Sequence, residues 1–296
     1  MPAIVPPGYT RGPIVFIGPL HDHASEERLL QLFWDNAGAY GARILVISLD
    51  EETDPAAHRF AHLFAQWESD SVAVATINSR GEAQDGQLLG VVEAATGLLI
   101  LGENPVRSAT ILGGTPLAQA MRRANAQGKT IGGVGSGGAI LCEHMISFDP
   151  RQDFTKHPYL HRQLIQFAPG LGITNRVAVD SIPSDQAGTW MQLARLLNAV
   201  AYNPFLIGIG LKTDAGVVIY PDNSLEVFGQ NNVLVVDGAG MTYTNVHEAA
   251  ADAPLSMLGI QLHMLTEGYT FDLAQRSAHP PSTDDIPEAT QTKSAF

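Results

Sequence analysis

Residues 131–146 read IGGVGSGGAILCEHMI, an apolar stretch that passes through a glycine-rich turn into a second apolar stretch. A strand, a sharp turn and a helix in this order form the nucleophile elbow, where a G-x-S-x-G motif holds a serine above a helix N-terminus. In this frame the outer glycines are Gly133 and Gly137, and the nucleophile's position holds Gly135. The pattern predicts an elbow without a nucleophile, although glycines at such a turn also simply let strand and helix pack closely.

Ser136 is the alternative nucleophile, one residue after the expected position. Its use would need a glycine at position 134, where the chain carries Val134, a β-branched residue poorly suited to a strained turn. It would also need a histidine as base. His144 would lie about 12 Å away if the helix were continuous, which leaves His157 and His161 as further candidates.

Alternating strand and helix signals surround the turn. The expected strands are 13–18, 43–48, 71–76, 97–101 and 130–134, and the expected helices are 24–40, 55–68, 85–95, 115–128 and 138–145. Apolar strands separated by helices indicate a parallel sheet covered on both faces. Later strands are expected at 176–180, 206–211, 216–220, 225–228 and 233–236, with a helix at 187–201. The fold class is therefore α/β, with a mostly parallel central sheet, helices on both faces and an antiparallel C-terminal extension.

Length and composition fit one domain. The chain has 296 residues, of which 45% are hydrophobic, enough for one large core. We expect a single α/β domain over residues 1–278. Residues 279–296 are polar and contain three prolines, so we expect a tail that orders only against a partner.

The net charge and the N-terminal residues restrict the expected partners and cellular location of the protein. The net charge of −13 and the pI of about 5.1 disfavour binding to nucleic acid and to anionic membranes. The single cysteine, Cys142, excludes an intramolecular disulfide and is expected to be a buried, inert helix residue. The first residues, MPAIVPPGYTRGP, lack the features of a signal peptide, and no apolar run reaches the ~18 residues of a membrane span. We expect a cytoplasmic protein.

Metal binding is weakly indicated. His21-Asp22-His23 follows the first expected strand, at an edge where ligands bind in such sheets, and His157 and His161 have a spacing of four. Pro158 argues against a helix between the latter pair, and no H-E-x-x-H pattern is present. We expect no metal and no cofactor. The acidic residues Asp180, Asp185 and Asp214 fit remnants of a binding pocket as well as solvated or capping groups.

Several blocks of the sequence together resemble the cyanophycinase family and the related aspartyl dipeptidases, the S51 peptidase group. The blocks span about 13–278 and are LGGTPLAQAMRRANAQGKTIGGVGSGGAILCEHMI (112–146), PGLGITNRVAVD (169–180), NPFLIGIGLKTDAG (203–216), VVDGAGMTYTNVHEA (235–249) and PLSMLGIQLHML (254–265). The resemblance implies the S51 fold, of the class I glutamine amidotransferase-like type. It also implies dimerisation and a serine hydrolase acting on β-aspartyl peptides.

The catalytic positions implied by the resemblance carry other residues. The family's nucleophilic serine falls on Gly135, the histidine of its D-Q-H-F motif on Ile182, and its acidic glutamate on Thr213. Glycine has no group that attacks a carbonyl, and isoleucine cannot accept a proton. In D-Q-H-F only the aspartate is matched, by Asp180, while Ser181 replaces the glutamine.

The binding positions implied by the resemblance also differ. The family's G-G-D-Q turn reads Gly102-Glu103-Asn104-Pro105 here. No arginine or lysine lies between Asp180 and Arg195, where the family's arginines are expected to hold the acidic part of a β-aspartyl-arginine substrate. A pocket built on the remaining positions would use Gly102, Glu103, Asn104, Ser136, Asp180 and Ser181.

Two functions follow from these substitutions. The first is a catalytically inactive cyanophycinase-like protein with a binding or assembly role and a peptide as its ligand, as a homo-oligomer or as the silent partner of an active relative. The alternative is a divergent serine-type peptidase that hydrolyses β-aspartyl peptides through Ser136 and a relocated base. Serine-directed covalent probes separate the two, because only a hydrolase should label at Ser136.

Overall fold

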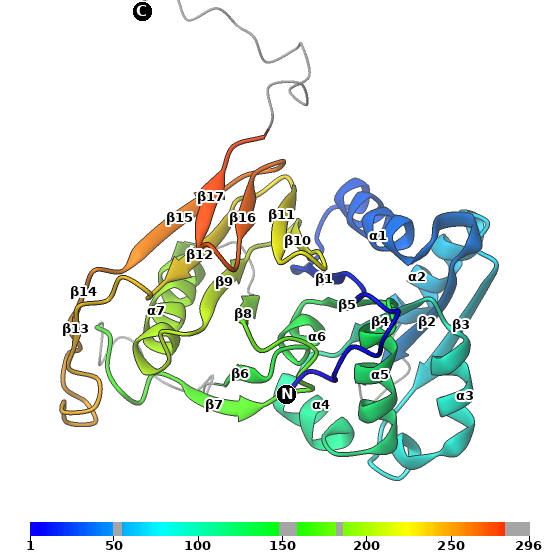
Figure 1. Ribbon diagram of the computed structural model, residues 1–296, viewed down its shortest axis with the longest axis horizontal. Coiled ribbons are helices and arrows are strands. Elements are labelled where there is room, and N and C mark those ends of the chain that lie inside the picture. The colour runs from blue at the N-terminus through cyan, green and yellow to red at the C-terminus, as the bar shows by residue number, and fades with distance from the viewer. Residues whose placement is uncertain (50–54, 148–158, 182–185, 282–296) are drawn as a thin grey trace, which may run out of the picture.

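The structure is a computed structural model that describes residues 1–49, 55–147, 159–181 and 186–281, without the side chains of 186–189 (Figure 1). Its predicted α/β class is confirmed by a nine-stranded central sheet in the order β17-β16-β11-β10-β1-β5-β4-β2-β3. The strands are β1 (Ile14–Ile17), β2 (Arg43–Ser48), β3 (Ser71–Thr76), β4 (Gly97–Leu101), β5 (Thr130–Val134), β10 (Ala215–Ile219), β11 (Ser224–Gly229), β16 (Thr270–Asp272) and β17 (Ser277–His279). The five strands from β1 to β3 in this order are parallel, and β10, β11, β16 and β17 continue the sheet antiparallel.

Helices cover both faces of the parallel part, as the apolar strands predict (Figure 1). The helices α1 (His23–Ala37) and α2 (Pro55–Gln66) bury Phe33 and Phe64 on one face. The helices α3 (Gly86–Ala94), α4 (Pro105–Leu112) and α5 (Pro116–Ala126) bury Leu117 and Met121 on the other. The short 3₁₀ turns Ala39–Gly41 and Glu82–Gln84 join these elements. Helix α5 begins as its sequence predicts, because the Thr115 hydroxyl accepts a hydrogen bond from the Ala118 N–H.

A second sheet lies beside the central one, in the order β15-β12-β9-β8. It consists of β8 (Val177–Ser181), β9 (Ile207–Leu211), β12 (Val233–Asp237) and β15 (Gln261–Leu265), and helix α7 (Gln186–Tyr202) packs on β8, β9 and β12. The sequence places β8, β9 and β12 in the antiparallel extension, but they form this separate sheet. Of the later strands that the sequence predicts, only the hairpin β10–β11 joins the central sheet. The reason is burial, since Val179 and Ile209 pack into the main core while Leu234 and Val236 pack under α7.

The segment after the elbow differs from the prediction. The expected helix at 138–145 is wrong, because helix α6 covers only Ser136–Ala139 and strand β6 (His144–Ser147) follows. Strand β6 pairs antiparallel with β7 (Gln166–Pro169), so a tertiary pairing replaces the helix that the local sequence favours. The two-residue strands β13 (Tyr243–Thr244) and β14 (Met257–Leu258) form a small ribbon. None of the helices in the described parts of the chain is long and apolar enough to cross a membrane.

Candidate functional site

The turn between β5 and α6 has the shape of a nucleophile elbow. Gly135 adopts φ 56° and ψ −126°, a conformation that side chains rarely adopt. A Cβ on Gly133 would lie 2.4 Å from the Gly137 carbonyl oxygen, and a Cβ on Gly137 would lie 2.4 Å from the Ile100 carbonyl oxygen. A Cβ on Gly135 would meet no atom within 4 Å. The outer glycines are required by close packing, whereas the middle position keeps open space for a side chain that the chain does not have.

Two cavities lie on either side of this turn. The smaller has a volume of about 300 Å³ and the larger about 520 Å³. They share Glu103, Ser136 and Ser181 in their walls. The structure brings together the residues expected to form the pocket: Asn104 and Asp180 line the smaller cavity, Gly102 and Gly135 the larger, and Glu103, Ser136 and Ser181 both.

The sheet topology explains this convergence. Strands β4, β5 and β8 all end at this edge, and the carboxyl ends of strands are where α/β proteins place their ligands. Asn104 caps α4 by accepting a hydrogen bond from the Arg107 N–H at 3.0 Å. Glu103 therefore lies at the junction between β4 and α4, in a short connection fixed at both ends.

Ser136, the alternative nucleophile, shares neither cavity with a histidine of the described residues. It is half-buried at the start of α6, and its hydroxyl has no hydrogen-bond partner among the described residues. His144 lies on β6 with its ring edge against Phe167, 5.9 Å between centroids, and lines neither cavity. His161 packs against Tyr159, also away from both cavities. Another candidate, His157, lies outside the described residues.

Asp180 serves a buried ion pair. Arg195 Nε donates to Asp180 Oδ2 at 2.8 Å, and the two residues are 2% and 6% exposed. Burial raises the pKa of Asp180, and the positive charge of Arg195 opposes that rise. Gln192 adds a second tie by donating to the carbonyl oxygens of Asp180 and Leu211 at 2.7 and 2.9 Å. Arg195 therefore lies inside the core, where it cannot hold a substrate.

Of the other two predicted triad positions, one lines neither cavity and the other lies outside the described residues. Thr213 follows β9, its carbonyl oxygen accepts a hydrogen bond from Asn231 at 2.7 Å, and it lines neither cavity. Ile182 and Asp185 lie outside the described residues. Asp214 is buried, and its carboxylate accepts a hydrogen bond from the His21 backbone N–H at 2.9 Å. Asp214 therefore holds the loop that follows β1.

In the His21-Asp22-His23 segment, considered above as a metal site, the aspartate has a structural role. Asp22 caps helix α1 by accepting the Ser25 N–H at 3.0 Å. Within residues 1–49, 55–147, 159–181 and 186–281, no three histidine, cysteine, aspartate or glutamate side chains group as metal ligands would.

Cys142 is buried, as expected, and burial raises the pKa of its thiol to about 12. The expectation that it lies in a helix is wrong, because Cys142 forms an isolated β-bridge with Thr174.

Sequence reasoning missed one charged pair at the site. Arg59 on α2 lines the larger cavity, and its guanidinium donates to both carboxylate oxygens of Glu26 at 2.8 and 2.7 Å. The carboxylate of Glu26 is buried while Arg59 is partly exposed. The two residues are 33 positions apart and lie on different helices, so no local sequence pattern predicts the pair. The only sequence signal is that both helices follow strands that end at this edge.

Comparisons with known proteins find cyanophycinases similar to the chain over most of its length. The chain is 31% identical over 275 residues to the cyanophycinase of Geminocystis herdmanii, covering 92% of this chain and 97% of that protein. It is 29% identical over 276 residues to the cyanophycinase of Trichormus variabilis, covering 93% and 90%.

The fold itself has a solved counterpart. The crystal structure of a peptidase from an acI-B1 Actinobacterium superposes with a TM-score of 0.62 at 18% identity, over 90% of this chain and 98% of that one. No profile of a known protein family matches the chain. Because the relationship to the first cyanophycinase extends over almost the full length of both proteins, the chain belongs to the cyanophycinase family.

Proposed function

We propose that this protein binds peptides at the elbow cavities without hydrolysing them. The observation that carries the proposal is Gly135, which keeps the backbone conformation of a nucleophile elbow, and the space for a nucleophile, but has no side chain. Acyl transfer by a serine hydrolase requires a nucleophile activated by an adjacent base. The positions that would supply base and acid carry Ile182 and Thr213, neither of which can do so.

The cavities favour an extended ligand. They flank Ser136 and share its wall, so a peptide can cross the turn with one part in each. Glu103 lines both, so a carboxylate, the group that attracts a cation, lies in the wall that the two cavities share. Arg59, the cation in the larger cavity, is already engaged by Glu26. The ligand we propose is therefore a peptide that carries an arginine side chain, such as a fragment of the β-aspartyl-arginine polymer.

Binding is tested by titration calorimetry with β-aspartyl-arginine oligomers. Glu103→Gln should weaken binding at least about tenfold, since a charge-assisted hydrogen bond contributes roughly 1.5–3 kcal/mol. Glu27→Gln is the matched control, because Glu27 is an exposed carboxylate that lines neither cavity. Equal affinity of the wild type and Glu103→Gln would remove Glu103 from the site, and an absence of binding by the wild type would contradict the proposal.

Hydrolysis is tested on the same oligomers with wild type, Ser136→Ala and Gly135→Ser. We expect no release of product above buffer from any of the three, because Gly135→Ser restores a hydroxyl but no base. Turnover by the wild type that is lost in Ser136→Ala would overturn the proposal. It would establish the second candidate, a peptidase that acts through Ser136, which is favoured only by the presence of that hydroxyl in both cavities.

We also propose that the protein self-associates through β14 and β15. Leu258, Leu262 and Met264 are 57%, 48% and 58% exposed there. Strand β15 forms the outer edge of the second sheet (Figure 1). Leu262 and Met264 share the sheet face that α7 covers elsewhere, because they pair with Val236 and Leu234. An edge strand with exposed apolar side chains favours pairing with a second copy.

A further inference from the structure

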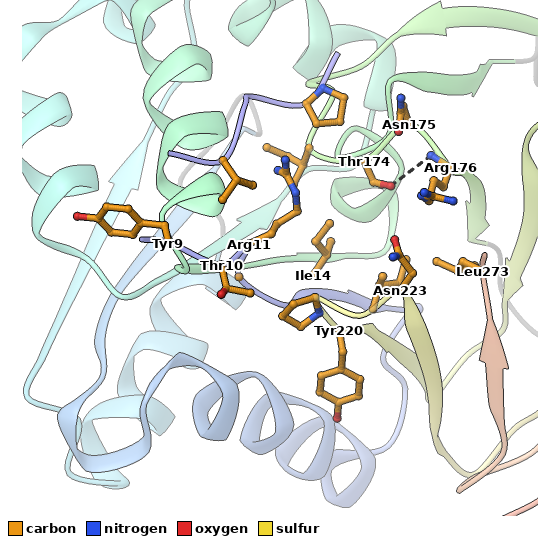
Figure 2. Close-up of a pocket in the computed structure, with 16 residues that line it drawn as sticks. Tyr9, Thr10, Arg11, Ile14, Thr174, Asn175, Arg176, Tyr220, Asn223 and Leu273 are labelled. Atoms are coloured by element: carbon orange, nitrogen blue, oxygen red, sulfur yellow. Dashed lines mark hydrogen bonds between the residues drawn. The ribbon is translucent and has the colours of Figure 1, made fainter. Parts of the chain in front are cut away.

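A third cavity lies at the opposite edge of the sheets from the elbow (Figure 2). Its volume is about 470 Å³. Strand β1 begins beside it, strand β10 ends beside it, and the segment 9–12 that precedes β1 forms part of its wall. It is separate from the elbow cavities, because Arg176 precedes β8 here while Asp180 and Ser181 end the same strand at the elbow, roughly 15 Å away at about 3.3 Å per residue.

The wall of this cavity carries positive charge that no wall residue neutralises. Arg11 and Arg176 line it, and the described residues of the wall include no aspartate or glutamate. The chain as a whole has 30 acidic and 17 basic residues. A cavity with two guanidinium groups and no carboxylate is therefore opposite in sign to the rest of the molecule.

Arg11 is held in place by neutral acceptors. It is half-buried, and it donates to the Asn125 side-chain oxygen at 3.2 Å and to the Ala3 carbonyl oxygen at 2.7 Å. Burial lowers the pKa of Arg11, because its charge is partly desolvated. A guanidinium has five N–H donors, so these two hydrogen bonds fix its orientation and leave donors for a ligand.

Arg176 is positioned through its backbone. Its N–H donates to the Thr174 hydroxyl at 3.3 Å, as Figure 2 shows, and its carbonyl oxygen accepts the Ile207 N–H at 2.9 Å. Its half-buried guanidinium forms no ion pair with any described residue. In the view of Figure 2, Thr174 and Ile14 lie between the two arginines.

The wall of the cavity also includes polar residues, such as Thr174 and Asn175, and apolar ones. Ile14, Ile173 and Leu273 line the cavity and are buried against the core. A compact anion such as phosphate would leave most of the volume of about 470 Å³ without contacts. A dianion with an apolar middle would place one acid group on each guanidinium and its methylene groups on these side chains.

We propose that this cavity binds a small dicarboxylate whose acid groups are joined by an apolar chain. Carboxylates match the planar donor fork of arginine, and two of them neutralise the two cations. The site is independent of the elbow and of any hydrolytic activity there.

The proposal is tested by titration calorimetry of the full chain with succinate, adipate and suberate, and with hexanoate and inorganic phosphate alongside. We expect binding of one dicarboxylate per chain, at least tenfold tighter than hexanoate and than phosphate. Arg176→Gln should weaken dicarboxylate binding at least tenfold. Arg123→Gln is the matched control, because Arg123 is an exposed arginine in the last turn of α5, outside the cavity.

A second variant, Arg11→Lys, keeps the charge that holds the N-terminal segment but removes the donor fork, and should also weaken binding. Circular dichroism with thermal unfolding establishes that each variant is folded. The proposal is overturned if the wild type binds none of the three dicarboxylates, or if Arg176→Gln binds them as well as Arg123→Gln does. Phosphate binding as tight as that of the dicarboxylates would equally overturn it.

Discussion

Arg195 on α7 and Asp180 at the end of β8 form an ion pair inside the protein, with 2.8 Å between Arg195 Nε and Asp180 Oδ2. The pair ties the helix that covers the second sheet to the strand that forms a wall of the smaller elbow cavity. Asp180 is thus the residue that connects the site with the packing of α7.

Removal of one partner of this pair should destabilise the fold. Asp180→Ala removes the buried carboxylate that Arg195 Nε contacts, and we expect a loss of about 3–5 kcal/mol in the free energy of unfolding. Urea unfolding measures this loss. Arg28→Ala, which removes the exposed ion pair with Glu267, should cost less than about 1 kcal/mol. Equal effects of the two substitutions would show that the buried pair is not structural.

The three glycines of the elbow should differ in their tolerance of a side chain. Gly133→Ala and Gly137→Ala each force a Cβ to within 2.4 Å of a backbone oxygen, so we expect each to lose more than about 3 kcal/mol of stability. Gly135→Ala meets no neighbour and should lose only about 1–2 kcal/mol, through its positive φ. Thermal and urea unfolding of the series measures the order. A reversed order would mean that the turn does not have the elbow conformation.

Cys142 should make the stability of the protein sensitive to alkaline pH. Burial raises the pKa of its thiol to about 12, whereas an unfolded thiol ionises near pH 8.5. Stability is therefore complete below about pH 8.5 and falls as the pH rises toward 12, because only the unfolded chain releases the proton. Between about pH 8 and about pH 10 the wild type should lose about 2 kcal/mol more than Cys142→Ala in urea unfolding. Parallel pH profiles of the two proteins would contradict this.

Self-association through β15 should depend on its exposed apolar side chains. Leu262→Asp should shift the protein toward the monomer, since a carboxylate in an apolar contact is desolvated without a partner. Light scattering coupled to size-exclusion chromatography measures the mass. Val91→Asp is the control, because Val91 is an exposed apolar residue on α3, far from β15 in Figure 1. A monomeric wild type, or the same mass for both variants, would contradict self-association through β15.

Much of the parallel part of the fold could be predicted from local patterns. Strand Arg43–Ser48 contains a continuous apolar run, Ile44 to Ile47, and helix α5 carries its own start signal in Thr115 and Pro116. Such signals act within a few residues of the chain, so the sequence carries them directly. The segment after Ala139 was predicted wrongly because the strand at His144–Ser147 depends on pairing with the distant strand Gln166–Pro169.

The candidate site likewise has features that the sequence predicts and features that it does not. The glycine at position 135 of the motif can be read from the sequence, and the convergence of Glu103, Ser136 and Ser181 follows from strands that end at one edge. The pairing of Arg59 with Glu26 could not be predicted, because it joins two helices that meet only when the sheet has formed.

By itself, therefore, the sequence determined the α/β class, the glycine elbow and the absence of a side chain at position 135, since these depend on residue identity and short-range spacing. Only the tertiary structure decided that β8, β9 and β12 form a second sheet and that Arg195 is buried against Asp180. It also decided that Arg11 and Arg176 line one cavity. The physical reason is that each of these features joins segments distant in the chain, and such segments meet only when burial of the whole core brings them together.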